Sequence, residues 1–259
     1  MTQSPAPPEL DVAGRDALAE LLLSVADDEF VIGFWDSEWT GIAPMLEEDV
    51  ATSSIAQDEI GHARAIYELL ATLTGDDADR IAFGRDVDAY RHAALLDHAR
   101  GDWAFSVARR FLYEAADAVR LTALARSSWE PLAQLAGKMR REETYHRMHA
   151  DAWLRRLSDG PPDARDRLVE SLTRLWPDAQ EVFAPLAAEE ELHRHGFLPE
   201  PMRALHATWQ EAVRPVLALI VELPPAAPTL DGRTRRTDDF RWLHGQFTMV
   251  ARSEVGATW

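Results

Sequence analysis

The sequence predicts an all-α protein whose core is an antiparallel four-helix bundle. Four long segments repeat apolar residues at the three- and four-residue spacing of an amphipathic helix, and glycine and proline fall between these segments. The sequence contains no stretches of alternating β-branched residues, which would indicate strands. Helices of roughly 25 to 30 residues that are joined by short turns pack antiparallel, so the four segments form a bundle.

Turn residues give the boundaries of the four long helices. The first covers about residues 9–39, and "TGIAP" ends it. Pro44 suits the first position of the second helix, where no backbone N–H is needed, and that helix runs to about residue 74. The third covers about residues 102–126. "SSWEP" supplies an N-cap serine and a first-turn proline for the fourth, which ends near residue 158.

The remaining segments predict shorter elements. A short helix near residues 87–98 interrupts the connection between the second and third long helices. Two or three shorter helices follow the fourth long helix and reach about residue 222. The stretch "LPPAAPTLDGRTRRTDD" predicts a loop because of its prolines, and a last helix covers about residues 239–252.

The chain contains no segment that is long and polar enough to be a linker between domains. We therefore expect one domain over residues 1–259. Its core bundle covers about residues 9–158, and the C-terminal helices of residues 161–259 pack on the outside of that bundle.

Charge and missing residue types exclude several classes of function. The chain has 44 Asp+Glu against 27 Lys+Arg, a net charge of −17. Such a surface repels phosphate backbones and anionic bilayers, so we expect neither nucleic acid nor a membrane as a partner. The absence of cysteine removes disulfides and thiolate ligands and fits a reducing compartment. "MTQSPAPPEL" lacks the features of a signal peptide, and no run of about 18 apolar residues occurs, so we expect a cytoplasmic protein.

The stretch "QDEIGHAR", residues 57–64, places a glutamate and a histidine on a face that is otherwise apolar. Positions i and i+3 share one face of a helix, and Ile66 and Leu70 lie on the same face as Glu59 and His62. A carboxylate that is buried without a partner costs several kcal/mol. This face therefore predicts a partner for Glu59, either a cationic group or a metal ion.

The E-x-x-H motif occurs three times, and two of its copies repeat a larger pattern. Glu143 and His146 lie midway along the fourth helix, as the first pair does on the second helix. The helix before each pair carries one inward glutamate, Glu29 in "DDEFVIG" and Glu114 in "FLYEAADAV". Glu59 follows Glu29 by 30 residues, and Glu143 follows Glu114 by 29 residues. The two helix pairs therefore look like two copies of one hairpin.

These side chains form a candidate di-metal site, with the ligands Glu29, Glu59, His62, Glu114, Glu143 and His146. One Glu from each of two helices, with E-x-x-H from each of the other two, is the arrangement of ferritin-like di-iron proteins. Oxygen and nitrogen ligands without sulfur suit iron or manganese. Asp58 and Glu142 precede the core glutamates and can accept the histidine N–H groups. The alternative is a metal-free network of ion pairs and hydrogen bonds.

Two further clusters are predicted to face solvent. The third motif, Glu190 and His193, lies in the short charged segment "AEEELHRHG" and has no glutamate about 30 residues before it, so a solvated helix end is expected. Arg233, Arg235 and Arg236 form the densest basic cluster. We interpret them as a solvated loop.

The chain resembles the ferritin-like subunits of bacterial phenylacetyl-CoA epoxidase. "QDEIGHAR" and "REETYH" after "SSWEP" carry the resemblance, and all six candidate ligands fall on ligand positions of the catalytic PaaA-type subunit, where the position of Glu114 is an aspartate. Over nearly all of residues 15–259 the likeness is closer to the PaaC branch of the family. "RLW", "EVF", "LHATWQEAVRPVL" and the final tryptophan carry it.

The resemblance implies a multicomponent monooxygenase. Its parts would be two iron ions, a second ferritin-like oxygenase subunit or a second copy of this chain, accessory subunits and a flavin/iron–sulfur reductase. The reaction would be O₂-dependent epoxidation of the ring of an acyl-CoA such as phenylacetyl-CoA. The best-known PaaC members have lost most metal ligands, whereas this sequence keeps all six.

Three functions remain open at the level of sequence. The first is a di-iron oxygenase component, in which the six residues hold two metals. The second is a non-catalytic structural subunit that docks a catalytic homologue through a helical face. The third is a stand-alone ferritin-like protein that handles iron or peroxide.

Overall fold

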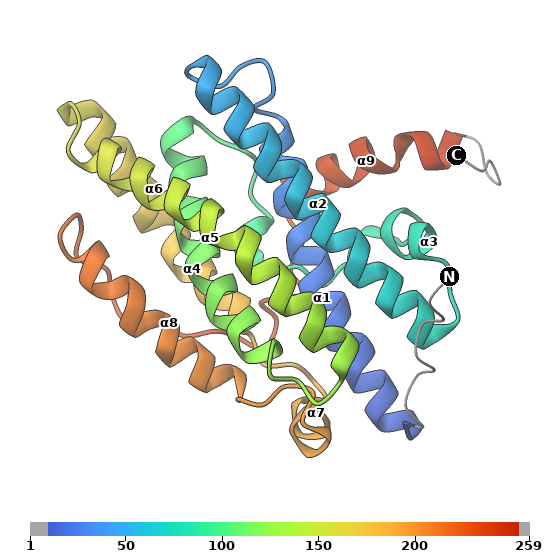
Figure 1. The fold of residues 1–259 in the computed structure, drawn as a ribbon. Helices are drawn as coiled ribbons and strands as arrows, with labels where there is room; N and C mark the ends of the chain where they lie inside the picture. Colours follow the sequence, from blue (N-terminus) through green and yellow to red (C-terminus); the bar gives the residue numbers. More distant parts are fainter. Residues whose placement is uncertain (1–9, 254–259) are drawn as a thin grey trace.

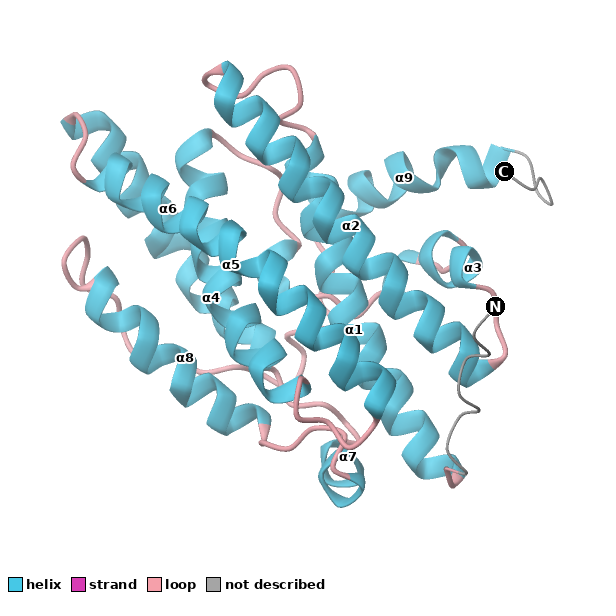
Figure 2. Ribbon diagram, in the orientation of Figure 1, coloured by secondary structure: helices cyan, strands magenta, loops and turns pink. Residues whose placement is uncertain are grey.

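The structure is a computed structural model that describes residues 10–253, and within these residues it is helical without strands. Figures 1 and 2 show a bundle of long helices with shorter helices around it. The bundle helices are α1 (Val12–Ser37), α2 (Leu46–Thr74), α4 (Trp103–Leu124) and α5 (Glu130–Ser158). The shorter helices are α3 (Ala78–Phe83), α6 (Pro162–Ala179), α7 (Glu189–His195), α8 (Met202–Leu217) and α9 (Asp238–Ser253), with 3₁₀ turns η1 (Val87–Ala89), η2 (Ala94–Leu96) and η3 (Gln180–Phe183). The predicted all-α bundle is confirmed.

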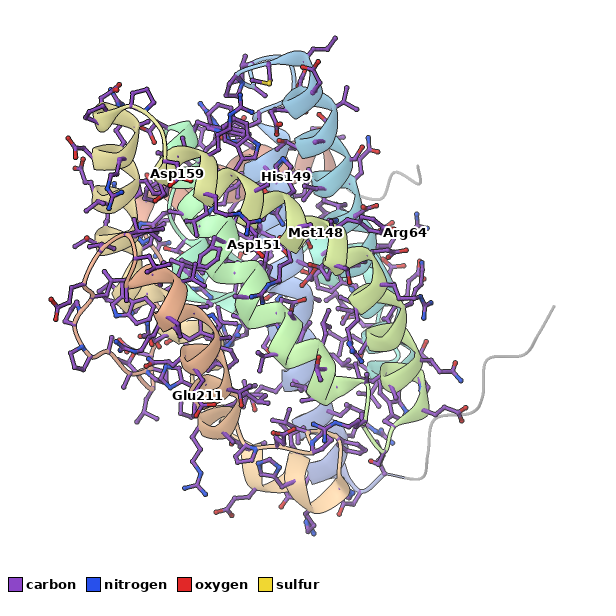
Figure 3. All side chains as sticks on the ribbon, turned by 60° about the vertical axis from the view of Figure 1, so that its left-hand side comes forward. Arg64, Met148, His149, Asp151, Asp159 and Glu211 are labelled. Carbon is purple, nitrogen blue, oxygen red and sulfur yellow. The ribbon has the colours of Figure 1, made fainter. Side chains whose placement is uncertain are left out.

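The bundle consists of two helical hairpins. Helix α1 packs along α2 and α4 packs along α5, while α2 and α5 lie against each other in front in Figure 1. Helices α6 and α8 cover the outer side of α4, so α4 carries buried side chains around its whole circumference, including Phe111, Leu112 and Tyr113. In contrast, α5 turns one side to solvent, where Tyr145 and Met148 are exposed (Figure 3).

Helix boundaries differ from the sequence predictions at two N-termini. Helix α2 begins at Leu46 with Met45 as its N-cap, so Pro44 lies in the preceding turn and not at the first helical position. Helix α5 has Trp129 as its N-cap instead of a serine. Ser128 is not free to cap α5, because its hydroxyl donates to the carbonyl of His195 at 2.6 Å.

The connection between α2 and α4 was also predicted incorrectly. Helix α3 occupies its first part, and residues 87–98 form two 3₁₀ turns, not one short helix. Buried carboxylates on α1 take the backbone amides of this segment: Arg91 N donates to Asp27 Oδ2 at 2.6 Å and Ala93 N to Asp28 Oδ1 at 2.7 Å. These side-chain acceptors compete with the i to i−4 bonds of a helix.

The arginine cluster of the C-terminal loop is only partly solvated, contrary to the prediction. Arg233 is buried and bonds both oxygens of Asp28, at 3.1 and 3.0 Å, and the carbonyl of Val182 at 2.6 Å. The side chain of Arg236 is buried beside Asp97. Only Arg235 matches the prediction, with a side chain that is 48% exposed. Arg233 therefore ties the loop to α1.

No helix within residues 10–253 has both the length and the apolar character that crossing a bilayer requires.

Candidate metal centre

The six predicted ligands meet in the middle of the bundle. Glu29 comes from α1, Glu59 and His62 from α2, Glu114 from α4, and the last pair, Glu143 and His146, from α5. Each of the six is buried, with an exposed fraction of 5% or less. They share one level of the bundle because each lies on the inward face of its helix, at matched positions in the two hairpins.

The ligand atoms form two groups that overlap. The first group is Glu29, Glu59, His62 and Glu143, and the second is Glu59, Glu114, Glu143 and His146. Within each group, one ligand atom per residue lies within 4.8 Å of the others. Glu59 and Glu143 belong to both groups. Two positions that share two carboxylates are the layout that a pair of bridged metal ions requires.

The two imidazole rings present Nδ1 to the cluster and Nε2 to the outside. The Nδ1 atoms of His62 and His146 each lie 3.2 Å from Glu143 Oε1. His62 Nε2 lies 2.8 Å from Glu142 Oε2 on α5, and His146 Nε2 lies 3.2 Å from Asp58 Oδ2 on α2. Each acceptor therefore serves the histidine of the opposite helix. A proton on Nε2 that is held in this way leaves the Nδ1 lone pair free for a metal.

Several inward polar atoms of the cluster have no hydrogen-bond partner among the described residues. They are Glu59 Oε2, Glu114 Oε2, both carboxylate oxygens of Glu143, and His146 Nδ1. The 3.2 Å separation of Glu143 Oε1 and His146 Nδ1 is short, but its angles do not make a hydrogen bond. Buried polar groups without partners are costly. These atoms fit a divalent metal ion, whose ligands are lone pairs that converge without protons between them.

Burial and mutual repulsion control the pKa values of the cluster. Burial and the charges of Glu143 and Glu29 raise the pKa of Glu59 well above its usual value. Burial and the charge of Glu143 do the same for Glu114. Burial alone would lower the pKa of His62, but the carboxylates of Glu143, Glu29 and Glu59, which lie close to its ring, outweigh burial and raise that pKa. Burial also acts on Glu29 and Glu143, but neighbouring groups, among them His62 and His146, outweigh it and lower the pKa values of these two carboxylates. Glu59 and Glu114 therefore favour the protonated form unless cations lie among the four carboxylates.

Sequence reasoning missed a cation at the edge of the cluster, Arg110 on α4. Its Nη1 bonds Glu59 Oε1 and Glu114 Oε1, and its Nη2 bonds Asp36. The only signal in the sequence was its position four residues before Glu114, which puts both side chains on one face of the helix.

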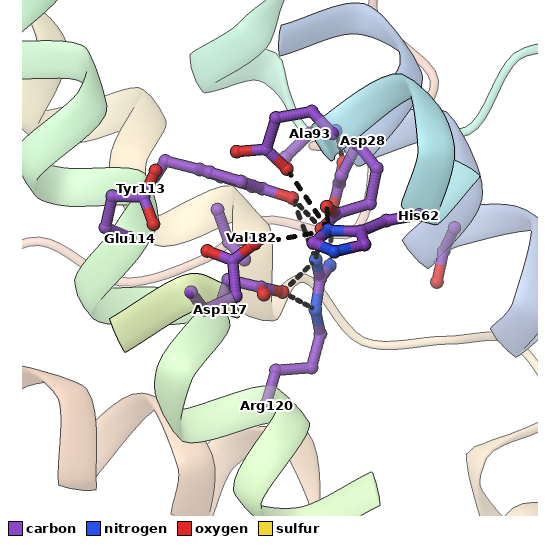
Figure 4. Close-up of polar contacts among 12 residues, drawn as sticks. Asp28, His62, Ala93, Tyr113, Glu114, Asp117, Arg120 and Val182 are labelled. Carbon is purple, nitrogen blue, oxygen red and sulfur yellow. Dashed lines mark hydrogen bonds and ion pairs between the residues drawn. The ribbon is translucent and has the colours of Figure 1, made fainter. Parts of the chain in front are cut away.

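A second buried network, also missed, supports Glu29. Tyr113 Oη donates to Glu29 Oε1 at 2.6 Å, and Arg120 Nη2 donates to Tyr113 Oη at 3.0 Å. Figure 4 shows Arg120 between Asp117 and Asp28, both of which it bonds. The signal was three consecutive acidic residues, the last of them Glu29, between the apolar stretches "LLL" and "FVIGFW", because buried carboxylates need partners.

A small pocket lies one turn above the cluster. Asp36, Arg110, Ala150 and three tryptophans are among the residues that line it. Three buried polar atoms of the lining, Thr52 Oγ1, Trp103 Nε1 and His149 Nδ1, have no hydrogen-bond partner within residues 10–253. The third E-x-x-H motif lies elsewhere, on α7, where Glu190 is exposed and His193 Nδ1 bonds the carbonyl of Leu198 at 2.6 Å.

The bundle and its cluster define a class. A four-helix bundle in which two helices each give one Glu and the other two each give E-x-x-H is the architecture of the ferritin-like proteins. Within that class, the chain belongs to the family described as phenylacetic acid catabolic protein, whose model matches residues 1–259.

Two curated relatives from Escherichia coli (strain K12) are similar to this chain, and both are subunits of 1,2-phenylacetyl-CoA epoxidase. The C subunit of that enzyme is 30% identical over 197 residues, which cover 76% of this chain and 79% of the relative. The A subunit is 25% identical over 176 residues, which cover 67% of this chain and 56% of the relative.

Proposed function

We propose that this chain is the PaaC-type component of a multicomponent monooxygenase that epoxidises the ring of an acyl-CoA such as phenylacetyl-CoA, and that it carries its own di-iron centre. The observation that carries the proposal is the pair of overlapping ligand groups with unpartnered inward atoms. Membership of the family and similarity to two epoxidase subunits support the reaction class. The donor set of four carboxylates and two imidazoles also fits manganese.

The six residues have separate roles in the proposed centre. Glu59 and Glu143 would serve both positions, while Glu29 and His62 would complete one and Glu114 and His146 would complete the other. When bound, the metal pair supplies reductive activation of O₂.

The surrounding residues fix the geometry of the proposed centre. Asp58 and Glu142 hold each imidazole with Nδ1 inward. Tyr113 holds one oxygen of Glu29 through its phenol proton. The burial of the six proposed ligands excludes bulk water from the reacting centre.

The proposed partners are a second ferritin-like oxygenase subunit, accessory subunits and a reductase. Both relatives are named as subunits of one enzyme, which supports partners of the first kind. A centre of this type needs two electrons for each O₂ that it splits between substrate and water, and this chain carries no cysteine for an iron–sulfur cluster. A separate reductase is therefore part of the proposal.

The competing function is a structural subunit without a metal. The identity to the C subunit of the epoxidase is higher than to its A subunit, 30% against 25%. This favours the structural subunit, because resemblance to the PaaC branch implies a member that has lost most ligands. Retention of all six ligands in one buried cluster favours the di-iron centre.

A single-turnover experiment separates the two functions. The chain is loaded anaerobically with Fe²⁺, chemically reduced, and mixed with phenylacetyl-CoA and O₂, and products are identified by mass spectrometry. We expect an oxygenated product that contains one atom of O₂, and none from the double variant His62→Ala/His146→Ala. His193→Ala is the matched control and retains the product. A wild-type chain that binds no iron supports the structural subunit instead.

A further inference from the structure

Arg110 bonds the two ligand groups unequally. Its Nη1 reaches one oxygen of Glu59 and one oxygen of Glu114. Both residues belong to the second group, which His146 completes. Of these two residues, only Glu59 also belongs to the first group. Its other oxygen, Oε2, lies toward His62, 3.8 Å from Nδ1, and has no hydrogen-bond partner among the described residues. The guanidinium therefore lies beside the second position and away from the first.

Arg110 depends on the cluster for its counter-charge. It is buried, and its one carboxylate partner outside the cluster is Asp36. Asp36 also lies 3.5 Å from Arg109 Nη2, so two arginines share one carboxylate. Glu59 and Glu114 supply the remaining negative charge that a buried guanidinium requires.

The arginine beside the first position is balanced differently. Arg120 Nη2 lies 3.5 Å from Glu29 Oε1, but Asp28 and Asp117 both bond this guanidinium. Arg120 thus has two carboxylate partners outside the six ligands, and although Asp28 is shared with Arg233, its charge is offset more fully than that of Arg110. The two metal positions accordingly differ in the net charge of their surroundings.

On the basis of the proposed di-metal centre, we infer that Arg110 makes its two positions unequal. The position of Glu29, Glu59, His62 and Glu143 fills first and holds its ion more tightly. A dication at the position of Glu114 and His146 is repelled by the guanidinium and competes with it for the oxygens of Glu59 and Glu114. That position still has Glu114 Oε2 and His146 Nδ1, so its affinity is lower and binding is retained. Repulsion between the guanidinium and a dication that shares its carboxylate partners reduces the affinity of the second position by at least about tenfold.

Anaerobic titration with Co²⁺ tests this inference. Calorimetry and the visible absorption of the bound ion monitor the titration. The wild-type chain should bind two ions in two separated steps. Arg110→Met keeps an unbranched side chain, shorter than that of arginine, and removes its charge, so the second affinity should rise by at least about tenfold and the steps should merge. Arg110→Lys keeps the charge and should keep the steps apart.

Two single-ligand variants assign the steps to positions. His146→Ala should retain the tight step at its wild-type affinity and lose the weak one, while His62→Ala should lose the tight step. Two equal steps in the wild-type chain, or an unchanged separation in folded Arg110→Met, would overturn the role of Arg110 and leave the metal centre standing. A wild-type chain that binds no Co²⁺ would overturn the proposed centre and this inference with it.

Discussion

His62 and His146 turn Nδ1 toward the carboxylates because their Nε2 atoms are occupied outside the cluster. The acceptors are crossed, so that Glu142 on α5 orients His62 of α2 and Asp58 on α2 orients His146 of α5. Each pair therefore also links the two hairpins of the bundle. Both acceptors are partly exposed, at 39% and 51% of their side chains, so they can be replaced without opening the core.

Alanine at either acceptor should weaken metal binding without unfolding the chain. Glu142→Ala releases His62, and Asp58→Ala releases His146, so each should lower the affinity of its own position by about 10- to 100-fold. Titration with Fe²⁺ under anaerobic conditions measures the loss. Glu68→Ala on α2, an exposed residue paired with Arg64, is the control and should leave both affinities unchanged. If Glu142→Ala and Asp58→Ala bound Fe²⁺ with the same affinities as Glu68→Ala, the two acceptors would not position the imidazole rings.

At this scale the sequence predicts which residues meet but not how they are connected. The phase of each helix placed six ligands on inward faces, and the repeated spacing paired the hairpins. The crossing of Asp58 and Glu142 was not predictable, because it depends on the lateral distance between α2 and α5. The reach of Arg110 across to Asp36 on α1 was hidden for the same reason. Long side chains that cross between helices leave no periodic signal in the sequence.

Helices α1 and α2 approach closely beside the cluster at Gly33. A Cβ added there would lie 2.8 Å from Ile60 Cγ1, 3.1 Å from the carbonyl oxygen of Ala56 and 3.1 Å from the Cβ of Glu59. The absence of a side chain at this position therefore sets the distance between the two helices at the level of the ligands. Gly61 offers a contrast on α2, because no atom lies within 4 Å of a Cβ added there.

Gly33→Ala should destabilise the fold by about 1–3 kcal/mol, since the added methyl group pushes α2 away. It should also weaken metal binding, because Glu59 moves with the helix. Gly61→Ala is the matched control and should raise stability by about 0.5–1 kcal/mol, as alanine does in a helix. Urea unfolding of both variants measures these differences. A neutral Gly33→Ala would contradict the close approach of the two helices.

The C-terminal loop is anchored to α1 by a buried ion pair between Arg233 and Asp28. Arg233→Met leaves Asp28 with Arg120 as its remaining cation and removes the bonds that hold the loop to α1. We expect a loss of about 3 kcal/mol in the free energy of unfolding. Arg235→Met, two residues away and half exposed, should change it by no more than about 0.5 kcal/mol. Equal effects in the two variants would show that burial of Arg233 is not what anchors the loop.

The sequence predicted which segments are helical and about how long they are, but it predicted the N-caps and the connecting segments less well. Periodic apolar residues fixed all four long helices to within a few residues. Met45 and Trp129 were not predictable as N-caps, because their positions depend on tertiary contacts such as that of Ser128 with α7. The loop arginines carried the charge pattern of a solvated segment, and only the fold brings Arg233 to Asp28.

For the whole molecule, the proposed metal pair makes the stability of the bundle depend on metal binding. Four buried carboxylates on four helices repel one another, and two divalent ions would neutralise them, so metal-binding free energy becomes folding free energy. Protons can replace metal in part, because the pKa values of Glu59 and Glu114 are raised by burial and by neighbouring charge. The single-domain organisation over residues 1–259 stays a prediction.

Chelation should therefore lower the thermal midpoint, and by more at pH 8 than at pH 6. A carboxyl group whose pKa is raised in the folded chain supports the fold below that pKa and opposes it above. The metal-free chain thus loses stability as pH rises, while metal-bound carboxylates remain ionised and neutralised at both pH values. Differential scanning calorimetry with and without chelator measures the difference. A larger effect at pH 6 would contradict the role of these carboxylates.

Anaerobic equilibrium dialysis against saturating Fe²⁺ measures whether the six residues of the bundle hold two metal ions. Iron per chain is counted for the wild type, for His62→Ala/His146→Ala and for His193→Ala, each shown to be folded by circular dichroism. We expect two irons in the wild type, two in His193→Ala and essentially none in the double variant. Equal iron content in the wild type and the folded double variant would contradict this expectation.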